Sequence, residues 1–311
     1  MDFMTQKVEI LLAAYNGEAF LREQIDSILA QTDDCWHLTV SDDASSDATP
    51  SILQEYCSRY PDRISMCRNT HGFGNARDHF FHLMRSCDAD YMFFCDQDDV
   101  WHPDKVFKSM QAMHLAEKQY GASVPLLVFS DQTPADSSLH PIADSLMAYQ
   151  AQYAKTIDYR ALLMQNIVTG GAMVINRPLA QLACRCPDQR KVIMHDWWIG
   201  TVAARFGRAI YLDEPLGLYR QHDSNSVGAK KARSFQFLWK NIMRLGELRK
   251  VILQKKAQAA VFAAAYSDQL TQEDQDFLTG FTRSRSGPLF YLQYRKHIHG
   301  LLRMVAMLVM G

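Results

Sequence analysis

The sequence has 311 residues, of which 48% are hydrophobic, so it can bury a substantial core and is neither a disordered nor a fibrous protein. Its seven cysteines are scattered, odd in number and not preceded by a signal peptide, which argues against a disulfide framework and indicates reduced thiols in the cytoplasm. The formal net charge is −1, but residues 230–311 carry 14 Lys and Arg against 5 Asp and Glu. A basic segment that follows an acidic body indicates an anionic binding surface, either a membrane or a nucleic acid.

Strand and helix patterns alternate through the first hundred residues. Strands are predicted at residues 8–14, 37–41, 63–67 and 91–95, with a helical pattern after each of the first three. The first apolar stretch is short and runs into a turn, so we expect a core strand there rather than a targeting signal. Because strands joined by helices need crossover connections, we predict an α/β fold with a mainly parallel sheet and helices on both faces.

The second half has a looser pattern. Strands are predicted at residues 126–130, 170–175, 209–212 and 216–219, with a polar loop at 133–140 and a helix from 195 to about 206. Helices are expected at residues 235–253 and 257–270, and a basic, amphipathic helix at 289–310. No apolar run reaches the roughly 18 to 20 residues of a membrane-spanning helix.

Polar side chains gather where three predicted strands end. Tyr15-Asn16, Asp42-Asp43 and the run Asp96-Gln97-Asp98-Asp99 all lie at carboxyl ends, where parallel sheets bind ligands. Asp96 and Asp98 are two residues apart after a strand and can serve one divalent cation, for which carboxylate oxygens are suitable ligands. The alternative is an acidic turn in which Asp99 caps the next helix.

The order of the motifs resembles that of family 2 glycosyltransferases with the GT-A fold. The motifs are A-x-Y-N-G, S-D-D-A-S-S-D-A-T, N-x-x-G-x-x-x-A-R and F-C-D-Q-D-D over about residues 7–106, followed by H-D-W-W and Y-R-Q-H-x-S-N-S-V-G up to about residue 228. The last motifs look most like the rhamnosyltransferase-type branch of bacterial surface polysaccharide enzymes. The resemblance implies a catalytic domain at residues 1–228, with a nucleotide-binding part at about 7–106 and an acceptor part at about 107–228. A basic helical region would follow at 229–311.

The resemblance assigns roles on the donor side of the site. Ala14, Tyr15 and Asn16 would line the base and ribose pocket, and Asp43 or Asp42 would accept the imide N–H of uracil or thymine. Arg77 would meet the diphosphate, unless it is an ordinary surface arginine. Asp96 would lie beside the ribose or a metal-bound water, and Asp98 would be the direct metal ligand. Gln97 is counted with the donor contacts, although its side chain is expected to point away. Arg220 would contact phosphate and His222 would be a third metal ligand, unless their roles are purely structural.

On the acceptor side, the resemblance makes Asp196 the catalytic base. Its carboxylate would remove the proton of the acceptor hydroxyl, giving a single displacement with inversion; the alternative is a helix N-cap. Gly170 and Gly171 would allow close approach of the acceptor, or would be a bend at the start of a strand. Trp197 and Trp198 could stack on a sugar ring, with one of them expected in the core.

The implied reaction is metal-dependent inverting sugar transfer with Mn²⁺ or Mg²⁺. The first choice of donor is dTDP-rhamnose, with UDP-hexose or UDP-N-acetylhexosamine as the alternative, and the acceptor would be a growing, lipid-linked surface polysaccharide. The basic C-terminal helices would contact anionic lipid at the inner face of the cytoplasmic membrane, or pack on the catalytic domain, or form a homodimer. Nucleic acid is not expected, because no aromatic-basic pattern accompanies the charge.

Two other classes of protein were weighed. A haloacid-dehalogenase-type phosphatase also has D-x-D after an apolar strand, but on its first strand, whereas three strand-helix units precede the motif here. A non-catalytic sugar-binding relative would not need both Asp98 and Asp196. The sequence lacks the Q-x-x-R-W motif of processive members, so we expect one sugar to be added per binding event.

Overall fold

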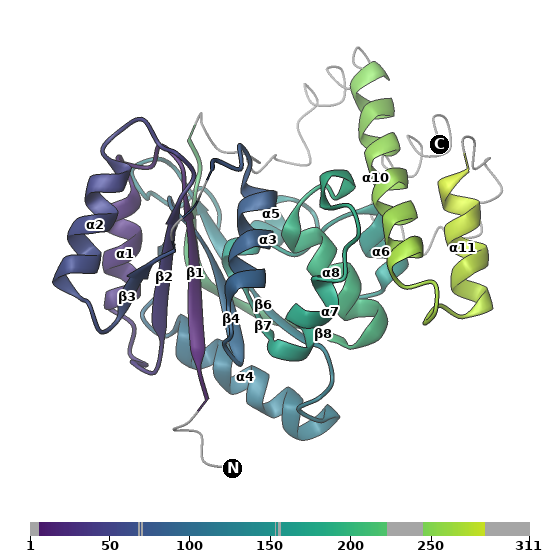
Figure 1. Ribbon diagram of the computed structural model, residues 1–311, viewed down its shortest axis with the longest axis horizontal. Coiled ribbons are helices and arrows are strands. Elements are labelled where there is room, and N and C mark those ends of the chain that lie inside the picture. Colours follow the sequence, from purple (N-terminus) through teal and green to yellow (C-terminus); the bar gives the residue numbers. More distant parts are fainter. Residues whose placement is uncertain are drawn as a thin grey trace.

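A computed structural model describes residues 6–67, 69, 71–152, 154, 157–222 and 245–283. The chain forms an eight-stranded sheet in the order β3-β2-β1-β4-β7-β6-β8-β5, with helices on both of its faces (Figure 1). The strands are β1 (Val8–Ala14), β2 (His37–Asp42), β3 (Ile64–Met66), β4 (Tyr91–Asp96), β5 (Val100–Trp101), β6 (Leu126–Ala135), β7 (Met173–Asn176) and β8 (Arg208–Arg220).

The register of the parallel strands brings the predicted motifs to one edge of the sheet. β1 pairs in parallel with β2 on one side and β4 on the other, so that Ala14 lies opposite Asp42 and Ala13 opposite Asp96. β2–β3 and β6–β8 are also parallel, whereas β7 runs antiparallel to β4 and β6, and β5 antiparallel to β8. The sheet is therefore mostly parallel, as the sequence predicts, with an antiparallel insertion at β7.

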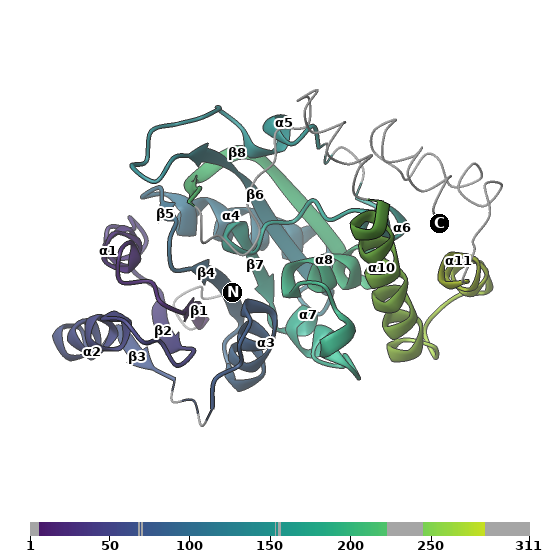
Figure 2. The same ribbon diagram turned by 90° about the horizontal axis from the view of Figure 1, so that it is seen from above.

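Two hydrophobic clusters cover the two faces of the sheet, because alternate residues of each strand point to opposite sides. In β1, Leu12 packs into the cluster under α1 (Leu21–Leu29), α2 (Thr49–Arg59) and α4 (Lys105–Tyr120). Leu11 packs into the other cluster, under α3 (Ala76–Ser86), α7 (Arg177–Ala183) and α8 (His195–Phe206). Figure 2 shows α3, α7 and α8 together on one side of the sheet.

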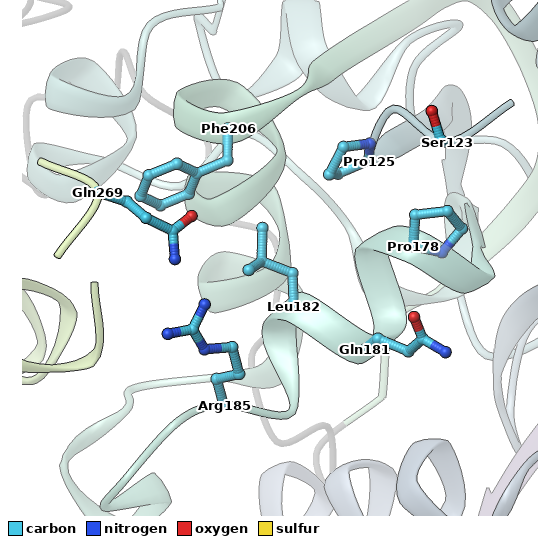
Figure 3. Close-up of a pocket in the computed structure, with 8 residues that line it drawn as sticks. All are labelled: Ser123, Pro125, Pro178, Gln181, Leu182, Arg185, Phe206 and Gln269. Carbon is cyan, nitrogen blue, oxygen red and sulfur yellow. The ribbon is translucent and has the colours of Figure 1, made fainter. Parts of the chain in front are cut away.

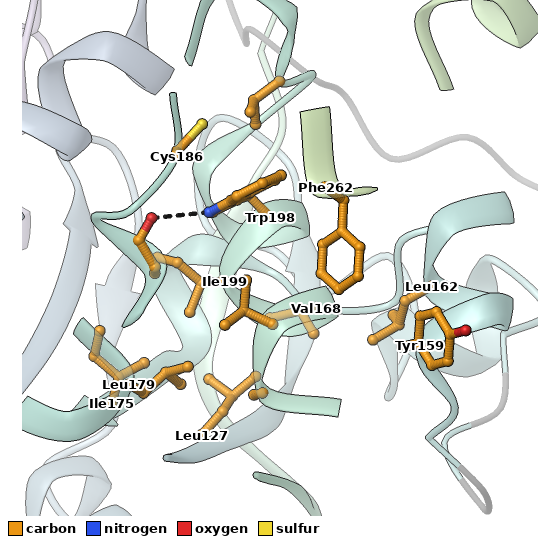
Figure 4. Close-up of a cluster of buried hydrophobic side chains, with 14 of the residues drawn as sticks. Leu127, Tyr159, Leu162, Val168, Ile175, Leu179, Cys186, Trp198, Ile199 and Phe262 are labelled. Atoms are coloured by element: carbon orange, nitrogen blue, oxygen red, sulfur yellow. Dashed lines mark hydrogen bonds between the residues drawn. The ribbon is translucent and has the colours of Figure 1, made fainter. Parts of the chain in front are cut away.

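The C-terminal helices α10 (Leu245–Ala265) and α11 (Gln272–Thr282) extend the second cluster. Phe262 of α10 packs edge-on against Trp198 of α8 at 5.8 Å between ring centroids, and lies 6.0 Å from the ring of Tyr159 in α6 (Tyr159–Met164). Figure 4 shows Phe262 reaching from α10 toward these two rings. Of the three arrangements weighed for the tail, packing on the rest of the chain is the one that residues 245–283 adopt. No helix in the described part of the chain is long and apolar enough to cross a membrane.

Several predicted boundaries are wrong. The polar loop expected at 133–140 begins later, because β6 continues to Ala135 by pairing Thr133 with Leu218 and Ala135 with Arg220. The two late strands are one strand, β8, whose register shifts take up the polar residues between them. Residues 170–172 form a 3-10 turn, η2, and only then does β7 begin.

The C-terminal helix boundaries also differ from the prediction. The break expected near residue 254 is absent, because Gln254, Lys255 and Lys256 are good helix formers and α10 runs through them. Helix α11 was not predicted at all, and a Thr271–Asp274 capping box starts it. The remaining short elements are α5 (Leu146–Tyr149) and the 3-10 turn η3 (Gln189–Lys191). The helix predicted at 289–310, and its proposed membrane contact, lie outside the described residues.

Candidate active site

A cluster of carboxylates lies at the end of β4. Asp96 is the last residue of the strand, and Asp98 and Asp99 follow in the turn before β5. Burial and the nearby charges of Asp98 and Asp196 raise the pKa of Asp96 to about 7. Asp99 is 1% exposed, and burial together with Asp98 and Asp96 raises its pKa well above the usual range. Burial and the neighbouring carboxylates thus disfavour the ionised forms of Asp96 and Asp99, and a cation bound beside them would favour ionisation.

Asp99 is not the helix cap that was weighed in the sequence. It accepts hydrogen bonds from the backbone N–H of Arg220 at 3.1 Å and from Nε2 of Gln132 at 3.2 Å. Helix α4 begins later and has Asp104 at its N-cap position. Asp99 thus ties the acidic turn to the ends of β6 and β8.

The Gly170–Gly171 turn connects the acidic cluster to Asp196. The backbone N–H of Gly170 donates to Oδ2 of Asp196 at 3.1 Å, and Gly171 lies directly beside Asp96 and Asp99. A Cβ on Gly171 would lie 2.9 Å from Oδ2 of Asp99 and 3.1 Å from Oδ2 of Asp96, and one on Gly170 would lie 2.9 Å from Nε2 of His195. Both positions therefore favour glycine, and the turn lies between Asp196, to which it donates, and the carboxylates of Asp96 and Asp99, against which it packs.

Asp196 lies in the first turn of α8 rather than at its N-cap, which is Met194. Its carboxylate accepts hydrogen bonds from the backbone N–H groups of Gly170 and Trp197 and, at 3.2 Å, from Nδ2 of Asn166. Burial raises its pKa to about 7, despite the opposing effect of these hydrogen bonds. A carboxylate with such a pKa can both hold and release a proton near neutral pH.

Lys105 was missed in the sequence. It is 1% exposed at the start of α4, its Nζ donates to the carbonyl oxygen of Gly171, and it lies 4.0 Å from the centroid of the Trp101 ring. Burial lowers its pKa to about 8, while the charges of Asp99 and Asp96 act to raise it. A lysine in the first turn of a helix is usually exposed, so only the tertiary structure shows that this one supports the turn between the carboxylates.

His222 and Arg220 close the site from the end of β8. Nε2 of His222 lies 2.8 Å from Oδ2 of Asp98, which places the two predicted metal ligands together. Arg220, by contrast, has a side chain that is 2% exposed and is bonded to the carbonyl oxygens of Asp98 and Ser137 and to Glu23. The expectation that Arg220 contacts phosphate needs correction, because its guanidinium holds the acidic turn in place.

The nucleotide side consists of the loops after β1 and β2. Gln97 is turned back toward β1, where its Oε1 accepts from the backbone N–H of Tyr15 at 2.7 Å and its Nε2 donates to the Tyr15 carbonyl at 2.9 Å. Asn16 has a left-handed backbone (φ 47°), which asparagine tolerates, and its Oδ1 accepts from the backbone N–H of Ser46 at 2.9 Å. Tyr15 itself is 56% exposed, so its ring is accessible to a ligand.

The two candidate base contacts differ in what they already bond. Asp43 accepts from the backbone N–H groups of Phe73 and Gly74 and so holds the glycine-bearing loop. Asp42 accepts from the backbone N–H of Ser45 at 3.1 Å through Oδ2, while its Oδ1 is buried without a hydrogen-bond partner. Asp42 therefore retains one carboxylate oxygen without a hydrogen-bond partner, whereas Asp43 is engaged with the glycine-bearing loop.

Two residues predicted for substrate contact are engaged elsewhere. Trp198 is fully buried in the core and donates through Nε1 to the carbonyl of Ala183 at 3.0 Å, so it does not stack on a sugar; Trp197 is half-buried. Arg77 pairs with Asp78 at 2.7 Å and donates to the carbonyl of Val192 at 2.9 Å, so its described contacts lie with α3 and the segment before α8 rather than with a phosphate site.

A cavity of about 420 Å³ lies away from all of these residues. It is shown in Figure 3 and is lined by Ser123, Pro125, Pro178, Gln181, Leu182, Arg185, Phe206 and Gln269. These residues come from the segment before β6, from α7 and the residues just after it, from the end of α8 and from the turn after α10. None of the predicted site residues lines this cavity, so it is not part of the candidate active site.

The mostly parallel α/β sheet, with the acidic turn after β4 and a carboxylate at the start of α8, defines a glycosyltransferase of the GT-A fold. The chain belongs to the family "Glycosyl transferase family 2", whose profile matches residues 9–180. It is 28% identical over 271 residues to the dTDP-rhamnosyl transferase RfbG of Shigella flexneri, covering 82% of this chain and 84% of that one.

Two solved structures share the fold at low sequence identity. TarS 1–349 of S. aureus, in complex with UDP-GlcNAc, superposes with a TM-score of 0.55 at 12% identity, covering 97% of this chain and 88% of that chain. The mannosyltransferase PcManGT of Pyrobaculum calidifontis, in complex with GDP-Man and Mn²⁺, gives a TM-score of 0.52 at 14% identity, covering 98% and 87%. Membership of family 2 excludes the phosphatase considered in the sequence, in agreement with the position of D-Q-D-D after β4 rather than β1.

Proposed function

We propose that this glycosyltransferase moves a sugar from a nucleotide-diphosphate donor to an acceptor hydroxyl with inversion at the anomeric carbon. The observation that carries the proposal is the Gly170–Gly171 turn, which donates to Asp196 through the N–H of Gly170 and packs closely against Asp96 and Asp99 at Gly171. A base for the acceptor and a carboxylate for the donor are thereby fixed on either side of one short segment. Reacting groups held in this way need little further ordering before reaction.

Asp196 acts as the general base in this proposal. Its ionised carboxylate takes the proton of the acceptor hydroxyl while the hydroxyl oxygen bonds to the anomeric carbon. The bond from that carbon to the diphosphate oxygen breaks at the same time, and the nucleoside diphosphate leaves with the electron pair. Because the pKa of Asp196 is raised to about 7 by burial, turnover is expected to fall as the pH drops through 7 and the base becomes protonated.

The donor side fits a divalent cation. Asp98 offers a carboxylate oxygen, which suits Mn²⁺ and Mg²⁺, and His222 offers an imidazole nitrogen, which suits Mn²⁺ better than Mg²⁺, with the charge of Asp96 nearby. When bound, the ion would supply positive charge that offsets the charge developing on the leaving diphosphate. Ala14, Tyr15 and Asn16 would form the base and ribose pocket, with Asp42 or Asp43 accepting the imide N–H.

For the donor we propose dTDP-rhamnose first, supported by the 28% identity to an enzyme described as a dTDP-rhamnosyl transferase. A UDP-hexose or UDP-N-acetylhexosamine is the alternative, supported by the shared fold of a structure that holds UDP-GlcNAc. The proposed acceptor is a lipid-linked surface polysaccharide at the inner face of the cytoplasmic membrane. The excess of basic residues in 230–311 supports this choice of acceptor. Gly170, Gly171 and Trp197 are the proposed acceptor contacts.

The test is diphosphate release and acceptor modification with a panel of nucleotide sugars, with and without Mn²⁺ or Mg²⁺. Asp98→Asn and Asp196→Asn are each expected to lower kcat at least about 100-fold. Asp104→Asn is the matched control, since Asp104 is half-exposed and pairs with Lys108 at 2.6 Å. The proposal fails if no donor turns over, as a non-catalytic sugar-binding protein would show, or if both site variants keep the wild-type kcat.

A further inference from the structure

Helix α10 lies beyond the family 2 match and shares the core of the catalytic part. Three of its side chains, Lys255, Gln258 and Phe262, are spaced at i, i+3 and i+7 and therefore lie on one face of the helix. Each of the three contacts α6, α8 or the segment directly before α8. These are the segments that carry Asp196 and its hydrogen-bond partner Asn166.

Gln258 fixes the chain just before α8. It is fully buried, and its Oε1 accepts from the backbone N–H of Ile193 at 2.8 Å, three residues before Asp196. The Nε2 of the same amide is buried without a hydrogen-bond partner. A buried amide that satisfies only one of its two ends is unfavourable compared with an apolar side chain of the same size. The one hydrogen bond that Gln258 makes is therefore the one that fixes the backbone at Ile193.

Lys255 fixes the last residue of α6. Its Nζ donates to the carbonyl oxygen of Met164 at 2.6 Å, two residues before Asn166. Asn166 folds its own turn by bonding both the N–H and the C=O of Val168, and donates to Asp196 at 3.2 Å. Lys255 and Gln258 thus hold the two backbone segments that meet at the Asp196 carboxylate.

We infer that α10 is part of the catalytic unit, and that Gln258 and Lys255 are positioning residues that set the orientation of Asp196 toward the acceptor hydroxyl. The inference rests on the proposed role of Asp196 as the base. In this role α10 orients the catalytic base, whereas the charge of the C-terminal segment alone would suggest that it contacts a membrane. A shift of the base by about 1 Å is enough to lower turnover substantially, even when the substituted residue does not touch substrate.

The experiment uses the full chain with Gln258→Met and Lys255→Met. Each is expected to lower kcat about tenfold and to leave the KM for the donor unchanged, while the Tm moves by no more than about 3 °C. Lys255→Arg keeps a donor for the Met164 carbonyl and should restore most of the lost kcat. The matched control is Lys256→Met: Lys256 lies on the same helix but donates to the carbonyl of Arg283 at 2.8 Å, so it should lower the Tm without lowering kcat.

A double-mutant cycle separates this inference from the proposed function. If Gln258 acts through Asp196, then Gln258→Met adds no further loss of kcat in the Asp196→Asn background. A kcat loss that is the same in both backgrounds would overturn the inference. So would a Lys256→Met variant that loses as much kcat as Gln258→Met, because the loss would then follow from destabilisation of α10 in general. If Asp196→Asn alone keeps the wild-type kcat, the proposed function is what fails.

Discussion

Asp274 gives the most quantitative prediction for the stability of this chain. Its side chain is 4% exposed at the start of α11 and accepts hydrogen bonds from the hydroxyl of Tyr159 at 2.5 Å, Nε of Arg205 at 2.9 Å and an N–H of Arg160 at 3.3 Å. It also forms the capping box with Thr271. One carboxylate thus joins α11 to the beginning of α6 and the end of α8.

Burial alone would raise the pKa of Asp274, but the hydrogen bonds from Tyr159, Arg205 and Thr271 outweigh this effect and lower it from 3.8 to about 2. A depression of this size corresponds to roughly 2.5 kcal/mol of stability. Since the folded-state pKa is the lower one, this stability is fully present above about pH 4 and is lost as the pH falls through 2. Asp274→Asn removes the charge at every pH and leaves two half-buried arginines without it, so a loss of about 3 kcal/mol is expected at pH 7.

The assay is urea unfolding followed by circular dichroism at pH 7 and at pH 2 to 3. The free-energy gap between wild type and Asp274→Asn should be near 3 kcal/mol at pH 7 and should shrink toward pH 2, where the wild-type carboxyl also becomes protonated. Asp276→Asn, an exposed change on the same helix, should stay within about 0.5 kcal/mol of wild type. A gap that is independent of pH, or no larger than that of Asp276→Asn, would refute the reasoning.

The remaining predictions concern the site. Gly171→Ala places a methyl group 2.9 Å from Oδ2 of Asp99 and 3.1 Å from Oδ2 of Asp96. We therefore expect the carboxylates to move and kcat to fall at least about 100-fold in steady-state assays. An unchanged kcat would show that the close packing of Gly171 against these carboxylates does not matter for turnover. Gln97→Ala removes both hydrogen bonds to the backbone of Tyr15, so the KM for the donor should rise about tenfold with a smaller change in kcat. A large fall in kcat with an unchanged KM would instead indicate that Gln97 acts in the chemical step.

Much of the nucleotide side could be predicted from sequence because β1 and β4 are mostly apolar and each strand ends in polar turn residues. β1 matches its predicted range, and β2 and β4 each extend one residue further. The range of helix α8 was also predicted correctly, and the spacing of its apolar residues indicates which face of the helix is buried. Trp198, Ile199, Val202 and Ala203 recur at the spacing of one buried helix face, which would have identified Trp198 as the core tryptophan and left Trp197 for the site.

Polar residues that act from buried positions could not be predicted in the same way. Lys105 and Gln258 have side chains that are usually solvated on a helix, and only the packing of α4 and α10 against distant segments buries them. The polar residues Asp213-Glu214-Pro215 indicated a loop, but register shifts against β6 absorb them within one strand. In each case a contact with a segment far away in the sequence decides the outcome, and local periodicity contains no information about that contact.

The packing of α10 also changes how the charge of the C-terminal segment is interpreted. The excess of basic residues in 230–311 was the reason to expect an anionic surface. Two of these residues, Lys255 and Lys256, point into the protein and donate to the carbonyl oxygens of Met164 and Arg283. Arg249 and Lys250, five to seven residues earlier on the same helix, are exposed. A count of charges therefore overstates what α10 can offer to lipid, because part of its basic character holds the segments around Asp196.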